Sequence, residues 1–257
     1  MTERHNIRGN RPLDIGLRHV AAVVPSNHGP CDVPAIRAHL ETLAQFPDHW
    51  PAISFSNHDV IRTATRFGPG SAKVMLALLC ALRGTILLYQ GEELGLPEVT
   101  LRRDQLKDPV GDLYYPLFRG RDGCRTPMPW DAAKPNLGFS AGPPWLPLGP
   151  EHAALAVSEQ EKDPNSTLAY TRALLAARRT HPALRVGSLT LLEAPLPLIA
   201  FARQSENETI FCVFNLGDTA TGWKLPQPAS ELPFGIDCDW KYGSAILGPG
   251  GAWFGVV

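Results

Sequence analysis

The sequence predicts an α/β region followed by a smaller all-β region. Apolar runs of strand length at 50–56 and 85–89 flank an apolar helical pattern at 71–83. Strand, helix, strand in this order is typical of a parallel sheet. After Gly187 the pattern changes to short β runs separated by turn residues, which is typical of a small antiparallel β-sandwich. We therefore expect two domains within the 257 residues, a length that allows each to bury a core.

The α/β region begins with a helix at Asp32, after a stretch at residues 1–31 to which we assign no domain. Asp32 is a candidate N-cap, and Pro34 is tolerated in the first turn. The helix at 71–83 is apolar on more than one side, which predicts that it packs inside the protein. Gly84 follows as its C-terminal glycine. These signals place two strands and two helices before residue 90.

A loop region at 96–150, rich in proline, glycine and aromatic residues, interrupts this pattern. Loops of this length inside a compact domain are usually functional. A helix is expected next at 166–184, where a basic last turn and a proline mark its end. The expected strands of the β region are 188–192, 198–203, 209–215, 222–225 and a last one at 253–257.

Composition excludes several classes of partner. The 24 Lys and Arg balance 25 Asp and Glu, so no nucleic acid or acidic membrane surface is expected. The five cysteines are scattered without metal-ligand spacing, which favours reduced thiols in the cytoplasm and neither metal nor cofactor. The longest apolar run, 74–82, is too short to span a bilayer, and the first residues lack an apolar signal segment. A small neutral polar ligand fits these features best.

Asn57, His58 and Asp59 end the predicted strand at 50–56, with Arg62 three residues later. The carboxyl end of a parallel strand is where α/β proteins place their chemistry. A carboxylate, an imidazole and a fixed positive charge can bind the hydroxyl groups of a sugar, and carboxylates stabilise an oxocarbenium-like transition state. The same residues could instead form a cap and an ion pair between Asp59 and Arg62. The spacing alone leaves both interpretations open.

Three long motifs, in order along the chain, resemble glycoside hydrolase family 13 of the α-amylase superfamily. They are Ser-Asn-His-Asp-Val-Ile-Arg at 56–62, Thr-Ile-Leu-Leu-Tyr-Gln-Gly-Glu-Glu-Leu-Gly at 85–95, and Arg-Asp-Gly-Cys-Arg-Thr-Pro-Met-Pro-Trp-Asp at 121–131. They are most similar to the α-glucosidase and oligo-1,6-glucosidase branch, and the resemblance extends from Asp32 to the C-terminus. It implies retaining hydrolysis of terminal α-linked glucose from oligosaccharides in carbohydrate metabolism.

The resemblance also implies roles for individual residues. Asp59 matches the carboxylate that binds the glucose 2- and 3-hydroxyls and stabilises the transition state. His58 matches the neighbouring substrate-binding histidine, and Arg125 matches an arginine that helps hold the glucose at the non-reducing end.

Other polar residues of these motifs are expected to support the site or the fold. Asn57, Arg62 and Glu92 belong to this group. Although Glu92 and Glu93 resemble an acid/base pair, we do not expect them to be catalytic, because neighbours on an extended segment point to opposite sides.

The chain departs from the family in one large respect. A retaining glycosidase needs a nucleophilic carboxylate and a second carboxylic acid about 5 Å away. In the family both precede the Asn-His-Asp motif, and no matching residues stand before Trp50. A complete (β/α)₈ barrel takes roughly 250 residues. We therefore expect residues 32–185 to form the C-terminal part of a (β/α)₈ TIM barrel and 186–257 a β-sandwich domain.

Several functional alternatives follow. As the C-terminal half of an α-glucosidase, the isolated chain is expected to be inactive and prone to aggregation, with the N-terminal half of the barrel as its partner. A transglycosylase or isomaltulose-type mutase of the same family would carry the same motifs. A non-catalytic carbohydrate-binding protein would use the retained glucose-binding loops for recognition alone.

Overall fold

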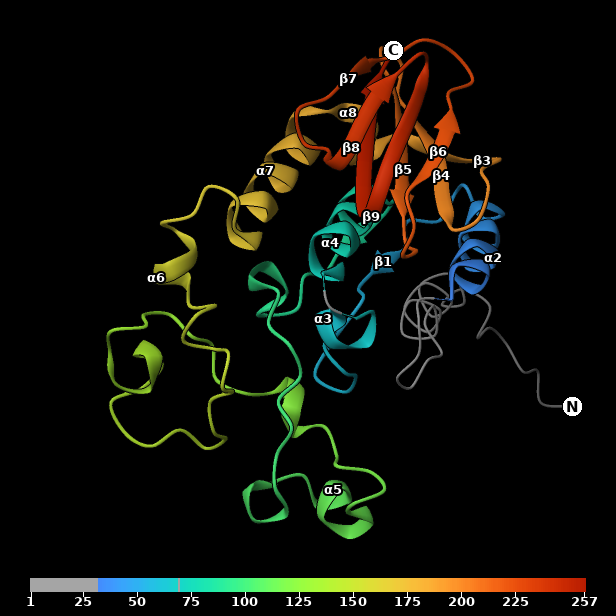
Figure 1. Ribbon diagram of the computed structural model, residues 1–257. Helices are drawn as coiled ribbons and strands as arrows, with labels where there is room; N and C mark the ends of the chain where they lie inside the picture. The colour runs from blue at the N-terminus through green and yellow to red at the C-terminus, as the bar shows by residue number, and fades with distance from the viewer. Residues whose placement is uncertain (1–31, 69) are drawn as a thin grey trace, which may run out of the picture.

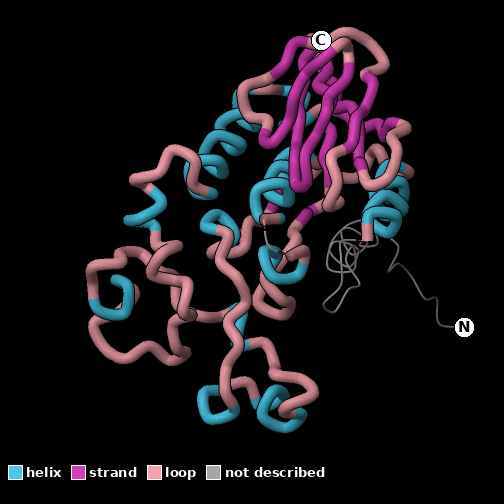
Figure 2. Tube along the Cα trace, in the orientation of Figure 1, coloured by secondary structure: helices cyan, strands magenta, loops and turns pink. Residues whose placement is uncertain are grey.

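The computed structural model describes residues 32–68 and 70–257, so the stretch at 1–31 lies outside the described residues. A seven-stranded sheet lies at one end of the molecule, packed on helices α4 (Ser71–Ala81) and α7 (Thr167–Thr180) (Figure 1). Loops and short helices extend away from the opposite side of α4, as the tube in Figure 2 shows. The order α/β then β agrees with the sequence prediction.

A short parallel ladder forms the α/β part. Strand β1 (Ala52–Ile53) pairs with β2 (Thr85–Ile86), with Ala52 opposite Thr85. Helices α3 (Thr63–Arg66) and α4 lie between them in sequence. The predicted strand–helix–strand order is therefore confirmed, but both strands are shorter than predicted. Each has a single partner among the described residues, so few ladder hydrogen bonds define it.

Local signals define the helix ends. The Asp32 carboxylate accepts a hydrogen bond from Ala35 N at 3.0 Å and caps α2 (Val33–Ala44), which confirms that predicted N-cap. Ser166 caps α7 in the same way. The single helix predicted at 166–184 is instead two, because α8 (Pro182–Val186) starts anew at a proline after α7.

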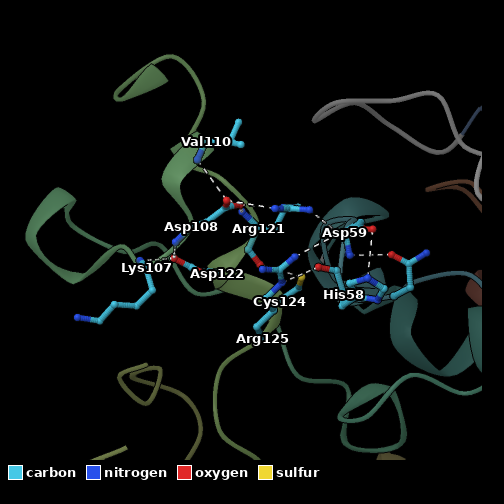
Figure 3. Close-up of polar contacts among 10 residues, drawn as sticks. His58, Asp59, Lys107, Asp108, Val110, Arg121, Asp122, Cys124 and Arg125 are labelled. Atoms are coloured by element: carbon cyan, nitrogen blue, oxygen red, sulfur yellow. Dashed lines mark hydrogen bonds and ion pairs between the residues drawn. The ribbon is translucent and has the colours of Figure 1, made fainter. Parts of the chain in front are cut away.

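The region at 92–160 contains only short helices joined by loops. They are η1 (Glu92–Leu94), η2 (Arg103–Gln105), α5 (Pro109–Tyr114), η3 (Asp122–Cys124), η4 (Pro135–Gly138) and α6 (Val157–Gln160). Figure 1 shows α5 at the far end of this region, on the side opposite the sheet. Segment 121–125 returns from it toward the turn after β1 (Figure 3).

The C-terminal strands are all antiparallel. They are β3 (Ser188–Leu192), β4 (Leu198–Gln204), β5 (Thr209–Asn215), β6 (Thr221–Lys224), β7 (Ser230–Glu231), β8 (Ile236–Lys241) and β9 (Ser244–Val256). Their order is β3-β4-β5-β9-β6, and β7 and β8 also pair with β9. The strands thus form one sheet around the long β9, whereas a sandwich has two sheets. The last strand begins at Ser244 rather than at 253, with four consecutive Gly and Pro residues at 248–251 inside it.

Both faces of this sheet are buried. Ile199 and Phe201 of β4 belong to the main core that includes α4, whereas Leu198 and Ala200, on the opposite face, pack with Trp253 in a second core. This alternation is the period of two expected of a strand. Continuous packing therefore joins the β part to the helices.

Two further features concern the described residues alone. None of their helices is long and apolar enough to cross a membrane. The cysteines at 80, 124, 212 and 238 are free thiols.

Candidate functional site

The turn that follows β1 holds the residues singled out in the sequence. Asn57 Oδ1 accepts a hydrogen bond from Asp59 N at 2.7 Å, so the asparagine side chain shapes the turn. Two segments from farther along the chain complete this site. Tyr89 follows β2, and its hydroxyl donates to Cys124 O at 3.1 Å. The three motifs that are distant in sequence are thereby brought together.

The Asp59 carboxylate has partners on both oxygens. Oδ1 accepts from Arg121 Nη1 at 3.0 Å and from Arg125 Nη2 at 3.1 Å. Oδ2 lies 3.2 Å from His58 Nε2. The side chain is nevertheless 47% exposed. The carboxylate is therefore held in a fixed orientation while it stays accessible to a ligand (Figure 3).

Arg125 binds the turn at two points. Its Nε donates to His58 O at 2.8 Å while Nη2 binds Asp59. The residue ends the 3₁₀ helix η3, which places its guanidinium against the turn. A planar fork of this kind has the geometry to hold a carboxylate and a carbonyl simultaneously.

Arg121 is a member of the site that the sequence analysis did not single out. Its Nη1 binds Asp59, and its other nitrogens bind Asp108. Hydrogen bonds to Asp108 and Asp59 raise the pKa of Arg121. Its place in the third motif, four residues before Arg125, was the only signal in the sequence that could have identified it.

Arg62 does not pair with Asp59. The residue is 1% exposed, and its Nη1 donates to Gln90 O at 2.7 Å. Burial lowers the pKa of Arg62. Among the described residues Asp59 binds Arg121 and Arg125 instead. The interpretation from the sequence that Asp59 forms an ion pair with Arg62 is therefore wrong.

Glu92 is buried beneath the turn. Its Oε1 accepts from Ser56 Oγ at 2.7 Å and from Thr63 Oγ1 at 2.5 Å, and Oε2 accepts from Tyr89 N at 2.8 Å. Burial raises the pKa of Glu92, against the opposing effect of these donors. The carboxylate thus ties the ends of β1, α3 and β2 together.

Glu92 and Glu93 lie in the 3₁₀ helix η1 and not on the extended segment assumed from the sequence. They still have separate environments. Glu92 is buried, whereas Glu93 Oε2 accepts from Gly91 N at 2.8 Å and is partly exposed. Within residues 32–68 and 70–257, no group of three His, Cys, Asp or Glu side chains could hold a metal ion.

Comparisons with known proteins identify the family of this chain. The family model described as "Alpha amylase, catalytic domain" matches residues 26–187. The "Probable alpha-glucosidase" of Rhizobium meliloti is 44% identical over 191 residues, which cover 72% of this chain and 34% of the relative. The "Oligo-1,6-glucosidase" of Parageobacillus thermoglucosidasius is 30% identical, over 69% of this chain and 36% of the relative.

Solved structures show the same relationship. The alpha-glucosyl transfer enzyme XgtA is 39% identical with a TM-score of 0.82, over 87% of this chain and 43% of that one. The trehalose-6-phosphate hydrolase TreA of Bacillus licheniformis, at 22% identity and a TM-score of 0.83 over 93% of this chain and 50% of that one, shares the fold. The chain spans about a third of the length of these curated relatives and half or less of these solved chains.

Proposed function

The chain belongs to the alpha-amylase catalytic-domain family, and on that premise we propose that it supplies the glucose-binding part of an α-glucosidase active site. Asp59 is the carboxylate that stabilises the transition state. His58 and Arg125 bind the terminal glucose beside it. One observation carries the proposal: the Asp59 carboxylate is oriented by His58, Arg121 and Arg125 and yet is half-exposed.

The orientation of Asp59 suits a role in binding rather than in bond breaking. Its oxygens are held in one orientation by two guanidinium groups and an imidazole. A carboxylate fixed in this way can bind sugar hydroxyls and face the positive charge that develops on the sugar ring. Retaining hydrolysis also needs a nucleophile and a general acid about 5 Å apart. In the proposed enzyme both come from the polypeptide that completes the barrel.

Three features support a partner of this kind. The parallel pair β1–β2 has no further strand beside it among the described residues, and parallel sheets normally have both faces covered. Leu87, which follows β2, is 46% exposed. The family relatives are also about three times longer than the segment that they share with this chain.

A chimeric enzyme tests the proposal. It joins the part of the Rhizobium meliloti relative that precedes its matching segment to residues 32–257 of this chain. The chimera should hydrolyse p-nitrophenyl α-glucoside and release glucose in the α configuration, whereas this chain alone should be inactive. Asp59→Asn should lower kcat/KM at least about 100-fold, because it removes a charge that acts on the transition state.

Asp239→Asn is the matched control, since Asp239 is an exposed carboxylate paired with Lys241 on β8. It should leave kcat/KM unchanged. A folded chimera whose activity survives Asp59→Asn would refute the role given to Asp59. Glucose binding without turnover by the folded chimera would favour a non-catalytic carbohydrate-binding protein.

Transglucosylation is the second candidate, and the 39% identity to an alpha-glucosyl transfer enzyme favours it. Both reactions pass through the same covalent glucosyl intermediate and differ in whether water or a hydroxyl acceptor attacks it. Products from maltose, with and without an added alcohol acceptor, decide between them. Hydrolysis converts each maltose into two molecules of glucose, whereas transfer releases one glucose and attaches the other to the acceptor.

A further inference from the structure

We propose that Asp108 is a positioning residue that holds Arg121 against Asp59 and so links the loop at 97–121 to the glucose-binding carboxylate. The inference rests on the proposed function of Asp59. It adds Asp108 to the site, a residue that acts on Asp59 only through Arg121.

The arrangement around Arg121 carries the proposal. Asp108 is buried and binds Arg121 through both carboxylate oxygens: Oδ2 accepts from Nε at 2.8 Å and Oδ1 from Nη2 at 3.2 Å. Oδ2 also accepts from Arg121 N at 3.0 Å. The remaining Nη1 is directed at Asp59 Oδ1, 3.0 Å away. One guanidinium therefore joins a buried and a half-exposed carboxylate (Figure 3).

The base of the loop fixes Asp108 in turn. Asp108 N and Lys107 N donate to Asp122 Oδ2 at 2.7 and 2.6 Å. Asp108 Oδ1 accepts from Val110 N at 3.2 Å and caps α5. The two arms of the loop meet closely at Gly111, where a Cβ would lie 2.6 Å from Arg119 O. Asp108 is thus held in place by Val110 on one side and by Asp122 and the main chain of Arg121 on the other.

Charge explains why this contact orients Arg121. The hydrogen bonds from Arg121 lower the pKa of Asp108 to about 2, so the carboxylate is ionised under all physiological conditions. A free arginine side chain has many rotamers, and ordering it has an entropic cost. A bidentate charge-assisted pair selects one of these rotamers before any ligand arrives.

The two arginines at Asp59 therefore differ in their anchors. Arg125 is anchored on His58 O, within the turn that carries Asp59. Arg121 is anchored on Asp108, in the loop that precedes the third motif. Of these two arginines, only Arg121 therefore transmits a displacement of the loop at 97–121 to Asp59.

Hydrogen exchange of the full chain, followed by mass spectrometry of peptides, tests the link without requiring activity. Asp108→Asn keeps the shape of the side chain and removes its charge. Arg121→Lys keeps the charge and removes the fork that reaches both carboxylates. Each should speed exchange of the amides in 56–62 several-fold. Asp112→Asn is the control, since Asp112 pairs with Arg103 on the surface of the same loop, and it should leave 56–62 unchanged.

Changes confined to 105–121 in both variants would overturn the proposal, because they would show a local structural role. If Asp108→Asn does not fold, Arg121→Lys still gives the answer, since it leaves the buried carboxylate with a cation.

Kinetics of the chimera provide the second measurement. Asp108→Asn and Arg121→Lys should each lower kcat/KM about 100-fold, the loss typical of a reacting geometry displaced by about 1 Å. The double variant should lose no more than either single variant, because both changes remove the same contact. Additive losses would contradict the link. An inactive parent chimera would count against the proposed function, whereas the exchange measurement would still decide the role of Asp108.

Discussion

Two pairs of arginines lie in opposite environments in this molecule. Arg121 and Arg125 bind the half-exposed carboxylate of Asp59 in the turn after β1. Arg178 and Arg203 are buried near the end of α4, and every hydrogen bond described for them goes to a main-chain carbonyl. The first pair binds a carboxylate that a ligand can reach, whereas the second pair binds main-chain carbonyls inside the protein.

The buried pair satisfies the end of a helix. Arg178 donates to Cys80 O at 2.6 Å and to Leu82 O at 2.8 Å, and Arg203 donates to Ala81 O. The last carbonyls of a helix have no partner within the helix, and a cation at this end also interacts favourably with the helix dipole. Burial lowers the pKa of both arginines, that of Arg203 to about 10. By contrast, neighbouring carboxylates raise the pKa of Arg121.

The kind of acceptor therefore distinguishes arginines that stabilise the fold from arginines that belong to the site. Removal of an arginine whose donors all bind buried carbonyls should destabilise the fold. The contact between an arginine and a half-exposed carboxylate contributes little to stability, because water replaces the lost contact. Its removal should therefore appear in activity.

The largest effect is expected from Arg203→Met. This change leaves the buried carbonyls of Gly187 and Ala81 without their donors, Nη2 at 2.9 Å from Gly187 O and Nη1 on Ala81 O. We expect the free energy of unfolding to fall by about 3 kcal/mol, because buried acceptors lose their partners. Guanidinium denaturation of the chain, followed by circular dichroism, measures it.

The control for this variant is Arg172→Met. Arg172 pairs with Glu161 on the surface, at 2.8 Å, and its loss should change the free energy of unfolding by less than about 0.5 kcal/mol. Equal denaturation midpoints for Arg203→Met and Arg172→Met would contradict the claim that the buried arginines stabilise the fold more than surface arginines do.

Arg125→Lys should show the opposite profile. A lysine cannot donate to His58 O and Asp59 Oδ1 together in the geometry of the fork. We expect kcat/KM of the chimera for p-nitrophenyl α-glucoside to fall about 100-fold, while the free energy of unfolding changes by less than about 1 kcal/mol. Arg102→Lys, which alters an exposed pair with Asp104, should change neither quantity. A variant that is destabilised yet fully active would assign Arg125 to the scaffold.

Much of the fold was predictable because its signals are local. The strands at 188–192 and 209–215 have the predicted bounds, and the Asp32 cap depends on residues three positions apart. The first part of β9 was missed because the Gly and Pro residues at 248–251 are typical of a turn. Pairing with β6 and β8 before these four residues, and with β5, β7 and β8 after them, continues the strand across them.

The site was predictable only in part, for the same reason. The motifs identified Asp59, His58 and Arg125, and the structure brings these three together. Arg121 lies 62 residues from Asp59, and no local pattern states which arginine a carboxylate will bind. The nearby Arg62 was the obvious partner by spacing, but its guanidinium is directed into the protein toward Gln90 O. Long-range ion pairs become visible only with the fold.

The smallest effect concerns acid stability and tests whether the anchor of Arg121 belongs to the scaffold. Arg121 lowers the pKa of Asp108 from 3.8 to about 2 in the folded chain. Such a carboxylate stabilises the fold above about pH 4, and this contribution disappears as the pH falls toward 2. The chain should lose on the order of 1–2 kcal/mol from this group over that interval. Asp108→Asn removes the titration and should flatten the decline, as urea denaturation between pH 2.5 and 5 would measure.

Asp104→Asn makes this measurement specific. Asp104 also binds an arginine, Arg102, but both side chains are about 70% exposed, so solvent screens their interaction. Its variant should follow the acid decline of the parent chain. If the two variants instead have the same pH dependence, the Asp108–Arg121 pair behaves as an ordinary surface pair. Arg121 would then have no rigid anchor, and the loop at 97–121 could not fix the orientation of Asp59.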